Sequence, residues 1–215
     1  MSALLQLAAD TSADLRDEAA LRRVYRTGPG ETSLAKVADH VHALYRPYIE
    51  ASPFAVLATL GPAGLDTSPR GDAPGFIVVA DAHTLLLPDR RGNQRIDSLR
   101  NIAQDPRVAL LFLIPGAGEA LRVNGTARIS ALPALCERFA VDGKPPASVL
   151  VIGVHSVFFQ CARAIKRSGL WNPASHVAAG TLPSPGAILE CLSHAGIDGN
   201  AYDATLQTRQ ASTLY

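Results

Sequence analysis

Short apolar segments recur along the middle of the chain, separated by turns that contain glycine, proline and aspartate. Most of these segments are too short to form helices, and their valine, isoleucine, leucine and phenylalanine content is typical of strands. Tight turns join several of them in pairs, which predicts β-hairpins. The predicted strands are residues 54–60, 65–69, 76–80, 84–87, 108–114, 121–130 and 148–159.

Apolar residues at helical spacing predict helices near both ends of the chain and between some of the strands. Ser33 and Asn93 are candidate N-caps, because their side-chain oxygens can accept a hydrogen bond from a free N–H group in the first turn. Ser184 and Pro185 begin a helix that Gly196 ends. The predicted helices are residues 13–26, 33–51, 94–104, 133–140, 162–169 and 185–196.

The order of these elements indicates the fold class. Strands follow one another in hairpins with few helices between them, which favours a mainly β, antiparallel, Greek-key-like barrel with flanking helices over a sheet of βαβ units. A chain of 215 residues suits one domain with terminal extensions. We therefore predict a helical N-terminal extension at 1–52, the barrel at 53–173 and a packed helical tail at 174–215.

Composition excludes several classes of function. Hydrophobic residues make up 47% of the chain and charged residues 18%, which is enough apolar material for a core. The net charge of +1 gives no general attraction to nucleic acid. Polar residues interrupt the longest uncharged stretch, 145–162, so no membrane span is expected. Three widely spaced cysteines (Cys136, Cys161 and Cys191) and a non-basic N-terminus favour a cytoplasmic protein with free thiols.

Positive charge is concentrated in the turn between the strand that ends at residue 87 and the helix predicted to begin at residue 94. Free N–H groups at the start of a helix, with guanidinium groups beside them, bind phosphate monoesters in many proteins. A solvated arginine-rich turn is the alternative interpretation, and Arg90 is the arginine expected to point to solvent. The residues of this candidate anion site are Pro88, Asp89, Arg91, Gly92, Asn93 and Arg95.

The chain resembles the pyridoxamine 5'-phosphate oxidase-like family of FMN-binding split β-barrel proteins, most of all its flavin-nucleotide-binding branch. The resemblance is carried by the blocks SPFAVLATLGPAGLDTSPRGD, LLLPDRRGNQRIDSLRNIAQDPRVALLFLIPG and LRVNGTARIS, and it continues through CARAIKRSGLWNP to YDATLQ and the final TLY. It implies an FMN-binding split β-barrel and a homodimer that holds FMN at the subunit interface.

The same resemblance assigns residues to the cofactor. It implies that Ser68, Arg70 and Gly71 line the flavin ring or its ribityl edge, where a guanidinium would stabilise negative charge on the reduced ring. An ion pair between Arg70 and Asp72 is the competing interpretation. The resemblance also implies that at least two of the residues Arg91, Asn93 and Arg95 bind the phosphate.

A second basic cluster contains Lys166, Arg167 and Trp171. The only tryptophan of the chain, close to two cations, is suited to stacking on a flavin or to closing a dimer interface. A core anchor is the alternative. The family resemblance implies that this cluster acts on the partner's FMN, and we expect the strands near 108–114 and 121–130 to contribute to the dimer interface.

The sequence contains no motif for a nucleophile–base pair, a metal site or a nucleotide loop. This fits a flavoprotein, in which the ring carries the redox chemistry. We predict an FMN-dependent oxidoreductase acting on a small molecule; the alternatives are an FMN storage or sensing protein and a true pyridoxamine 5'-phosphate oxidase. The last needs a second phosphate clamp, and residues 160–176 offer only Arg163, Lys166 and Arg167.

Overall fold

The computed structural model describes residues 3–215, which belong to two compact units. The first unit ends at Val37 and the second comprises Ala38–Tyr215. In the first unit, Asp17 caps a helix by accepting a hydrogen bond from the Ala20 amide at 2.7 Å. The helices of this unit are α1 (Ala3–Ala9), α2 (Glu18–Val24) and α3 (Glu31–Ala35).

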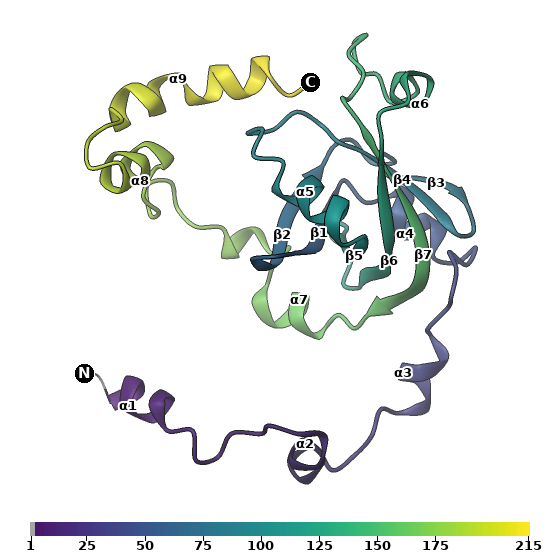
Figure 1. Cartoon of the computed structure of the whole chain (residues 1–215). Helices are drawn as coiled ribbons and strands as arrows, with labels where there is room; N and C mark the ends of the chain where they lie inside the picture. Colours follow the sequence, from purple (N-terminus) through teal and green to yellow (C-terminus); the bar gives the residue numbers. More distant parts are fainter. Residues whose placement is uncertain (1–2) are drawn as a thin grey trace. The chain divides into compact units, whose positions relative to one another are not determined.

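One seven-stranded antiparallel sheet forms the centre of the second unit (Figure 1). The strand order is β2-β1-β5-β6-β7-β4-β3, so the β3–β4 hairpin pairs on the far side of the β5–β6–β7 meander. The predicted mainly β, antiparallel barrel class with flanking helices is confirmed, and each predicted strand is present. The strands are β1 (Phe54–Gly61), β2 (Gly64–Gly71), β3 (Val78–Asp81), β4 (Thr84–Pro88), β5 (Arg107–Leu113), β6 (Ala120–Ser130) and β7 (Val149–Gln160).

The sheet curves until strands from opposite ends of its order come together. Arg70 lies on β2, at one edge, and Asp89 directly follows β4, which is next to the other edge. Four strands separate β2 from β4 in the sheet order, yet the Arg70 guanidinium and the Asp89 carboxylate are 2.6 Å apart. Such a contact requires a barrel-like closure. The ligand-sized cavity described below lies at this seam.

Alternation along the strands fills the barrel interior. In β5, for example, Val108, Leu110 and Phe112 are buried, whereas the residues between them are more exposed. The same period-two pattern in β1, β6 and β7 supplies the other walls of the core. The largest fully buried side chains are Phe112, Ile49, Leu57, Ile77, Leu85, Leu87, Leu110, Leu121, Leu150 and Ile152.

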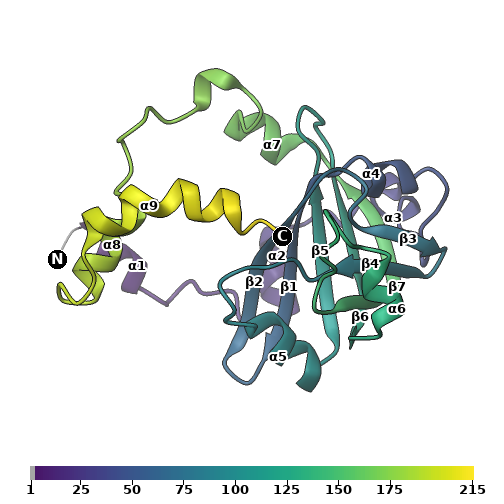
Figure 2. The same cartoon turned by 90° about the horizontal axis from the view of Figure 1, so that it is seen from above.

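Short helices flank the sheet. The helix α5 (Asp97–Gln104) packs on β1 and β2 (Figure 2), and its Ile102 is buried. Its Asn101 side chain donates a hydrogen bond to the Thr59 hydroxyl of β1 at 3.0 Å. The remaining helices of this unit are α4 (Arg46–Glu50), α6 (Pro133–Glu137), α7 (Arg163–Ser168), α8 (Pro185–Leu192), α9 (Gly199–Ser212) and the 3₁₀ helix η1 (Pro173–Ser175).

The prediction of one helix over 33–51 is wrong. The backbone of Ala38 exchanges two hydrogen bonds with Val157 of β7, and the Val41 amide donates to the Ala82 carbonyl oxygen at 2.7 Å. These pairings use backbone groups that a helix would have paired internally. The apolar residues of this region therefore lie on an extended segment instead of a helix. Ser33 lies inside α3, whose N-cap is Gly30.

Two further helix predictions need correction. The 13–26 helix shortens to α2, and α1 was not expected at all. The 185–196 helix ends as α8 at Leu192, and the longest helix of the tail, α9, was not predicted. Among the described residues, no helix combines the length and the apolar character that crossing a bilayer requires.

Candidate functional site

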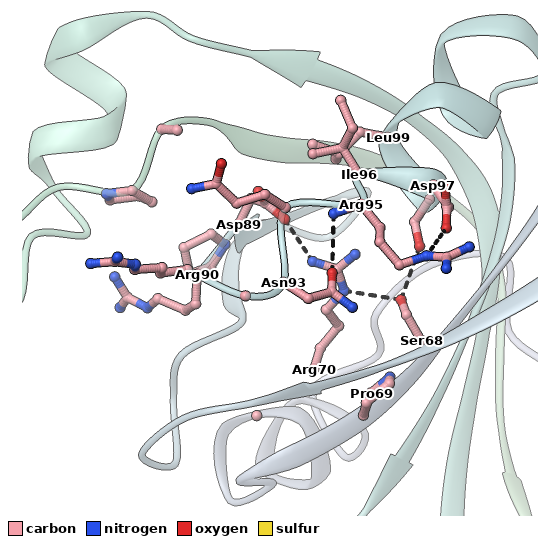
Figure 3. Close-up of a pocket in the computed structure, with 18 of the residues that line it drawn as sticks. Ser68, Pro69, Arg70, Asp89, Arg90, Asn93, Arg95, Ile96, Asp97 and Leu99 are labelled. Atoms are coloured by element: carbon pink, nitrogen blue, oxygen red, sulfur yellow. Dashed lines mark hydrogen bonds and ion pairs between the residues drawn. The ribbon is translucent and has the colours of Figure 1, made fainter. Parts of the chain in front are cut away.

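A cavity of about 1070 Å³ opens at the barrel seam (Figure 3). Its volume is at the upper end of the range for small-molecule sites. One wall comes from β2, a second from the loop between β4 and α5, and a third from the segment before β7 together with Tyr215. The lining residues are 66–71, Phe76, 88–99, 144–147 and Tyr215.

This cavity brings together nine of the twelve residues that the sequence predicted for a cofactor. The two predicted groups come from different elements, β2 and the β4–α5 loop, which meet only because the barrel closes. These nine are Ser68, Arg70, Gly71, Pro88, Asp89, Arg91, Gly92, Asn93 and Arg95.

Arg70 is held in place by two neighbours. Its Nη1 donates to Asp89 Oδ1 at 2.6 Å, and its Nε donates to the Ser68 hydroxyl at 3.2 Å. The Ser68 hydroxyl in turn lies 3.0 Å from that of Ser98, at the start of α5. The expected alternative, an Arg70–Asp72 pair, is wrong, because the closure of the barrel brings Asp89 to Arg70. Asp89 offsets much of the Arg70 charge.

Arg90 points inward, contrary to the expectation that it faces solvent. Its Nε donates to Asp72 Oδ2 and its Nη1 donates to the Phe139 carbonyl oxygen, each at 2.6 Å. The Arg90 side chain is 17% exposed and that of Asp72 is 5% exposed. A guanidinium held by a carboxylate and a carbonyl in this way is part of the cavity wall.

Asp72 also receives a hydrogen bond from the Tyr215 hydroxyl at 2.7 Å. Burial raises the pKa of the Asp72 carboxyl, but hydrogen bonds from Tyr215, the Ala73 amide and Arg90 outweigh burial, so this pKa lies below its usual value. The same hydrogen bond to Asp72, together with burial and the charge of that carboxylate, raises the pKa of Tyr215. Both shifts keep Asp72 ionised and Tyr215 protonated at neutral pH.

Arg91 and Arg95 differ from the two buried arginines. Arg91 is exposed and forms no ion pair with any described residue. The Arg95 side chain is 74% exposed, and its Nε donates to Asp97 Oδ2 at 2.7 Å. That hydrogen bond and the charge of Asp97 raise the pKa of Arg95, which stays fully charged. Among the arginines that line the cavity, these two therefore remain accessible to an anion.

The loop that carries them has an unusual backbone. Gln94 and Ile96 adopt positive φ values of 59° and 51°, which is costly for a β-branched residue such as isoleucine. Asn93 Oδ1 accepts a hydrogen bond from the Arg95 amide at 3.1 Å, which forms an Asx turn. Strained backbone of this kind is concentrated at binding sites.

The prediction that Asn93 caps a helix beginning at residue 94 is wrong. The helix α5 begins at Asp97, and its N-cap residue, Ile96, has no side-chain hydrogen bond to the first turn. Asn93 instead stabilises the loop that precedes the helix. The helix start still lies at the cavity, because 96–99 are among its lining residues.

Lys166, Arg167 and Trp171 lie away from this cavity. The first two are on α7, and the Trp171 indole N–H donates to the Ala117 carbonyl oxygen at 2.6 Å, in the turn between β5 and β6. This contact supports an anchoring role for Trp171 within its own chain. Contact of the cluster with a flavin bound by another subunit stays a prediction.

Sequence reasoning missed the third wall of the cavity, formed by 144–147 and Tyr215. The final TLY block carried part of the family resemblance but received no role. A signal was present in Pro145 and Pro146, since a rigid pair of prolines between a turn and a strand often shapes a wall. No sequence pattern predicts that Tyr215 reaches Asp72, because 143 positions separate them.

The chain belongs to the pyridoxamine 5'-phosphate oxidase family, since the model of that family matches residues 41–161. The match extends from the extended segment before α4 to the end of β7. It includes Arg70, Arg90, Arg91 and Arg95. No curated protein matches the chain. Within the described residues there is no group of three or more side chains suited to holding a metal ion.

Several solved structures are similar to part of the chain. HupZ from Group A Streptococcus is 21% identical over 53% of this chain and 89% of its own, with a TM-score of 0.44. General Stress Protein 26 from Bacillus anthracis is 17% identical over 53% and 88%, with a TM-score of 0.40. An F420 reductase is 23% identical over 53% and 94%, with a TM-score of 0.37. The family assignment rests on the family model and not on these values.

Proposed function

We propose that the cavity at the barrel seam binds FMN, with the phosphate at the loop that carries Arg91 and Arg95 and the flavin ring along Ser68–Gly71. The observation that carries this proposal is the division of the arginines: Arg70 and Arg90 are largely shielded from solvent and paired with Asp89 and Asp72, and the other two are exposed beside the start of α5. Exposed guanidinium groups next to a helix N-terminus suit a phosphate dianion.

The residues present fit this cofactor in two further respects. Apart from its two neighbours in the chain, none of the described residues has an atom within 4 Å of the position that a Cβ would take at Gly92, so internal packing does not demand a glycine there. Close approach of a ligand to the backbone would explain it. Two of the three carboxylates that line the cavity are also paired, because Asp89 pairs with Arg70, and Asp97 pairs with Arg95 and Arg100.

We further propose that the protein is an oxidoreductase for a small molecule. When bound, FMN supplies hydride and electron transfer through its ring. The chain's own contribution is to bind and orient it: Arg70 is fixed by Asp89 and Ser68 on β2, where its guanidinium can donate a hydrogen bond to electron-rich forms of the ring. Storage or sensing of FMN is the competing function, since the same binding residues serve both.

The first experiment is a titration of the ligand-free protein with FMN and with riboflavin, followed by quenching of flavin fluorescence. The proposal predicts tighter binding of FMN than of riboflavin. Equal affinity would contradict the phosphate site. An anaerobic screen of reductants then separates the two functions, because bleaching of the bound flavin by a donor, followed by reoxidation of the flavin by an acceptor or O₂, identifies an oxidoreductase.

Pyridoxamine 5'-phosphate tests the family's namesake reaction. We propose that it is not the substrate, because Arg163, Lys166 and Arg167 are the only cations in 160–176 and none of them lines the cavity. Incubation in air with this compound, followed through hydrogen peroxide and pyridoxal phosphate, is expected to give no turnover. Robust turnover would assign the vitamin B6 reaction to this protein.

We also propose that the protein is a cytoplasmic homodimer. Members of the resembled family hold FMN between subunits, and a second subunit would give Lys166, Arg167 and Trp171 access to a flavin that their own cavity does not offer them. The thiols Cys136, Cys161 and Cys191 are free, which suits a reducing compartment. Sedimentation of the FMN complex is expected to give the mass of two chains, and the mass of one chain would contradict the dimer.

A further inference from the structure

Tyr215 connects the tail of the second unit to the wall of the cavity. Its hydroxyl donates to Asp72 Oδ1 at 2.7 Å, and its ring lies under the Arg90 guanidinium, with 5.4 Å from Cζ to the ring centroid. Lys144 Nζ donates to the backbone oxygen of Tyr215 at 3.5 Å. Two barrel residues, Asp72 and Arg90, thus hold the Tyr215 side chain, and Lys144 holds its backbone.

Asp72, which accepts the hydrogen bond from Tyr215, is held in a fixed position. The Asp72 side chain is 5% exposed and bonds Arg90, whose second hydrogen bond goes to the Phe139 carbonyl oxygen. The Ala73 amide also donates to Asp72, at 2.7 Å. A carboxylate with several donors at fixed positions presents Oδ1, the oxygen that also accepts from the Ala73 amide, in one direction, so it specifies where the phenol binds.

The tail that leads to Tyr215 packs chiefly on itself. The Gly186 amide of α8 donates to the Asp203 carboxylate of α9 at 2.8 Å, and Ser184 and Asp198 cap these two helices. Among the described residues, the two hydrogen bonds found between 184–215 and the barrel are both made by Tyr215. A segment attached to the barrel by few contacts opens at low free-energy cost.

We propose that Tyr215 is a latch that closes the cavity over the bound ligand, and that release of Tyr215 from Asp72 and Arg90 opens the path by which the ligand enters and leaves. The ligand's identity as FMN rests on the proposed function. The closure itself rests on the position of Tyr215 and Lys144, which line the cavity together with the anion loop.

The latch gives Arg90 a role that differs from that of its neighbour Arg91. Arg90 pairs with the carboxylate that receives Tyr215, and it lies over the Tyr215 ring, so it interacts with both halves of the closed arrangement. Arg90 therefore acts as a positioning residue for the tail, whereas Arg91, the next residue, faces the ligand. This arrangement explains why two adjacent arginines have such different surroundings.

Three variants test the latch. Tyr215→Ala removes the hydroxyl and the ring, Tyr215→Phe removes only the hydroxyl, and Leu214→Ala changes the neighbouring exposed side chain as a control. In the ligand-free protein, amide hydrogen exchange across α9 and 213–215 is expected to accelerate about tenfold in Tyr215→Phe, the range for one hydrogen bond to a charged group. Tyr215→Ala is expected to exceed this value, and Leu214→Ala to match the wild type.

Ligand release gives the second measurement. In stopped-flow experiments the FMN dissociation rate is expected to rise in the order wild type and Leu214→Ala, then Tyr215→Phe, then Tyr215→Ala, again by about tenfold per lost interaction. Equal hydrogen exchange in all four proteins would overturn the latch. If wild type fails to bind FMN, the proposed function fails, while hydrogen exchange in the ligand-free protein still decides whether Tyr215 holds the tail.

Discussion

Two pairs of arginines line the same cavity and do different things. Arg70 and Arg90 are largely shielded from solvent and each is paired with a carboxylate from the other side of the barrel seam, whereas Arg91 and Arg95 are exposed on one short loop. The comparison teaches that the number of arginines around a cavity does not give the number of anion ligands. A guanidinium that is shielded from solvent and held by a carboxylate builds the wall, whereas a solvent-exposed one is available to bind, even where it has a carboxylate neighbour as Arg95 does.

The largest expected effect comes from breaking a buried pair. Arg90→Ala leaves Asp72 ionised and buried beside the lost guanidinium, so we expect the free energy of unfolding to fall by about 3 kcal/mol. Urea denaturation measures this value. Arg91→Ala is the matched control, since the adjacent side chain is exposed, and its unfolding curve is expected to overlay that of the wild type. Equal losses in the two variants would remove the distinction between wall and ligand arginines.

The reverse pattern is expected for binding. Arg95→Ala leaves the unfolding curve unchanged, because its pair with Asp97 is exposed to solvent. We expect it to weaken FMN about 10- to 100-fold, the range for a charge-assisted hydrogen bond to phosphate. Riboflavin serves as the control ligand in the same fluorescence titration. If riboflavin weakens as much as FMN, Arg95 does not contact the phosphate.

The pH dependence of stability tests the contribution of the Arg90–Asp72 pair. The pKa of Asp72 is lower in the folded protein than in the unfolded chain, so its stabilisation is present above about pH 4 and is lost as the pH falls through the folded-state pKa. Asp72→Asn mimics the protonated form, and we expect it to lower the free energy of unfolding by about 1–2 kcal/mol at pH 7. Thermal and urea unfolding at a series of pH values should show this difference shrinking as the pH falls through the folded-state pKa. A difference independent of pH would mean that the charge of Asp72 is not the cause.

The smallest effect concerns the strained loop. Ile96 has a φ of 51°, and asparagine tolerates this conformation better than a β-branched residue does. Ile96→Asn is expected to raise the free energy of unfolding by about 0.5–1 kcal/mol, with Leu99→Asn, on the regular first turn of α5, as a destabilising control. A loss of stability in Ile96→Asn would show that contacts of the isoleucine side chain outweigh the strain.

Local patterns in the sequence predicted the strands because each strand is selected by its own alternation. Val108, Leu110 and Phe112 identify a half-buried strand without reference to any other segment. The 33–51 helix failed for the opposite reason: the pairing of Ala38 with Val157 depends on a strand more than a hundred residues away. Tertiary hydrogen bonds there outweigh a weak local preference.

The same difference between local and long-range signals applies to the candidate site. The basic glycine-containing turn and the Ser68–Gly71 block were recognisable locally, and the cavity contains both. The partners of the arginines were not, because Arg70 meets Asp89 and Arg90 meets Asp72 only when opposite ends of the sheet close on each other. Tyr215 is the extreme case, since nothing in its neighbourhood in the sequence indicates the carboxylate that it binds.

A crystal structure of the protein with FMN tests the central claim most directly, that the exposed arginines bind the phosphate while the paired ones stay in the wall. It is expected to place phosphate oxygens within hydrogen-bond distance of Arg91 or Arg95, with the Arg70–Asp89 and Arg90–Asp72 pairs retained. A phosphate bound to Arg70 or Arg90 in place of its carboxylate, or FMN bound outside this cavity, would contradict the account.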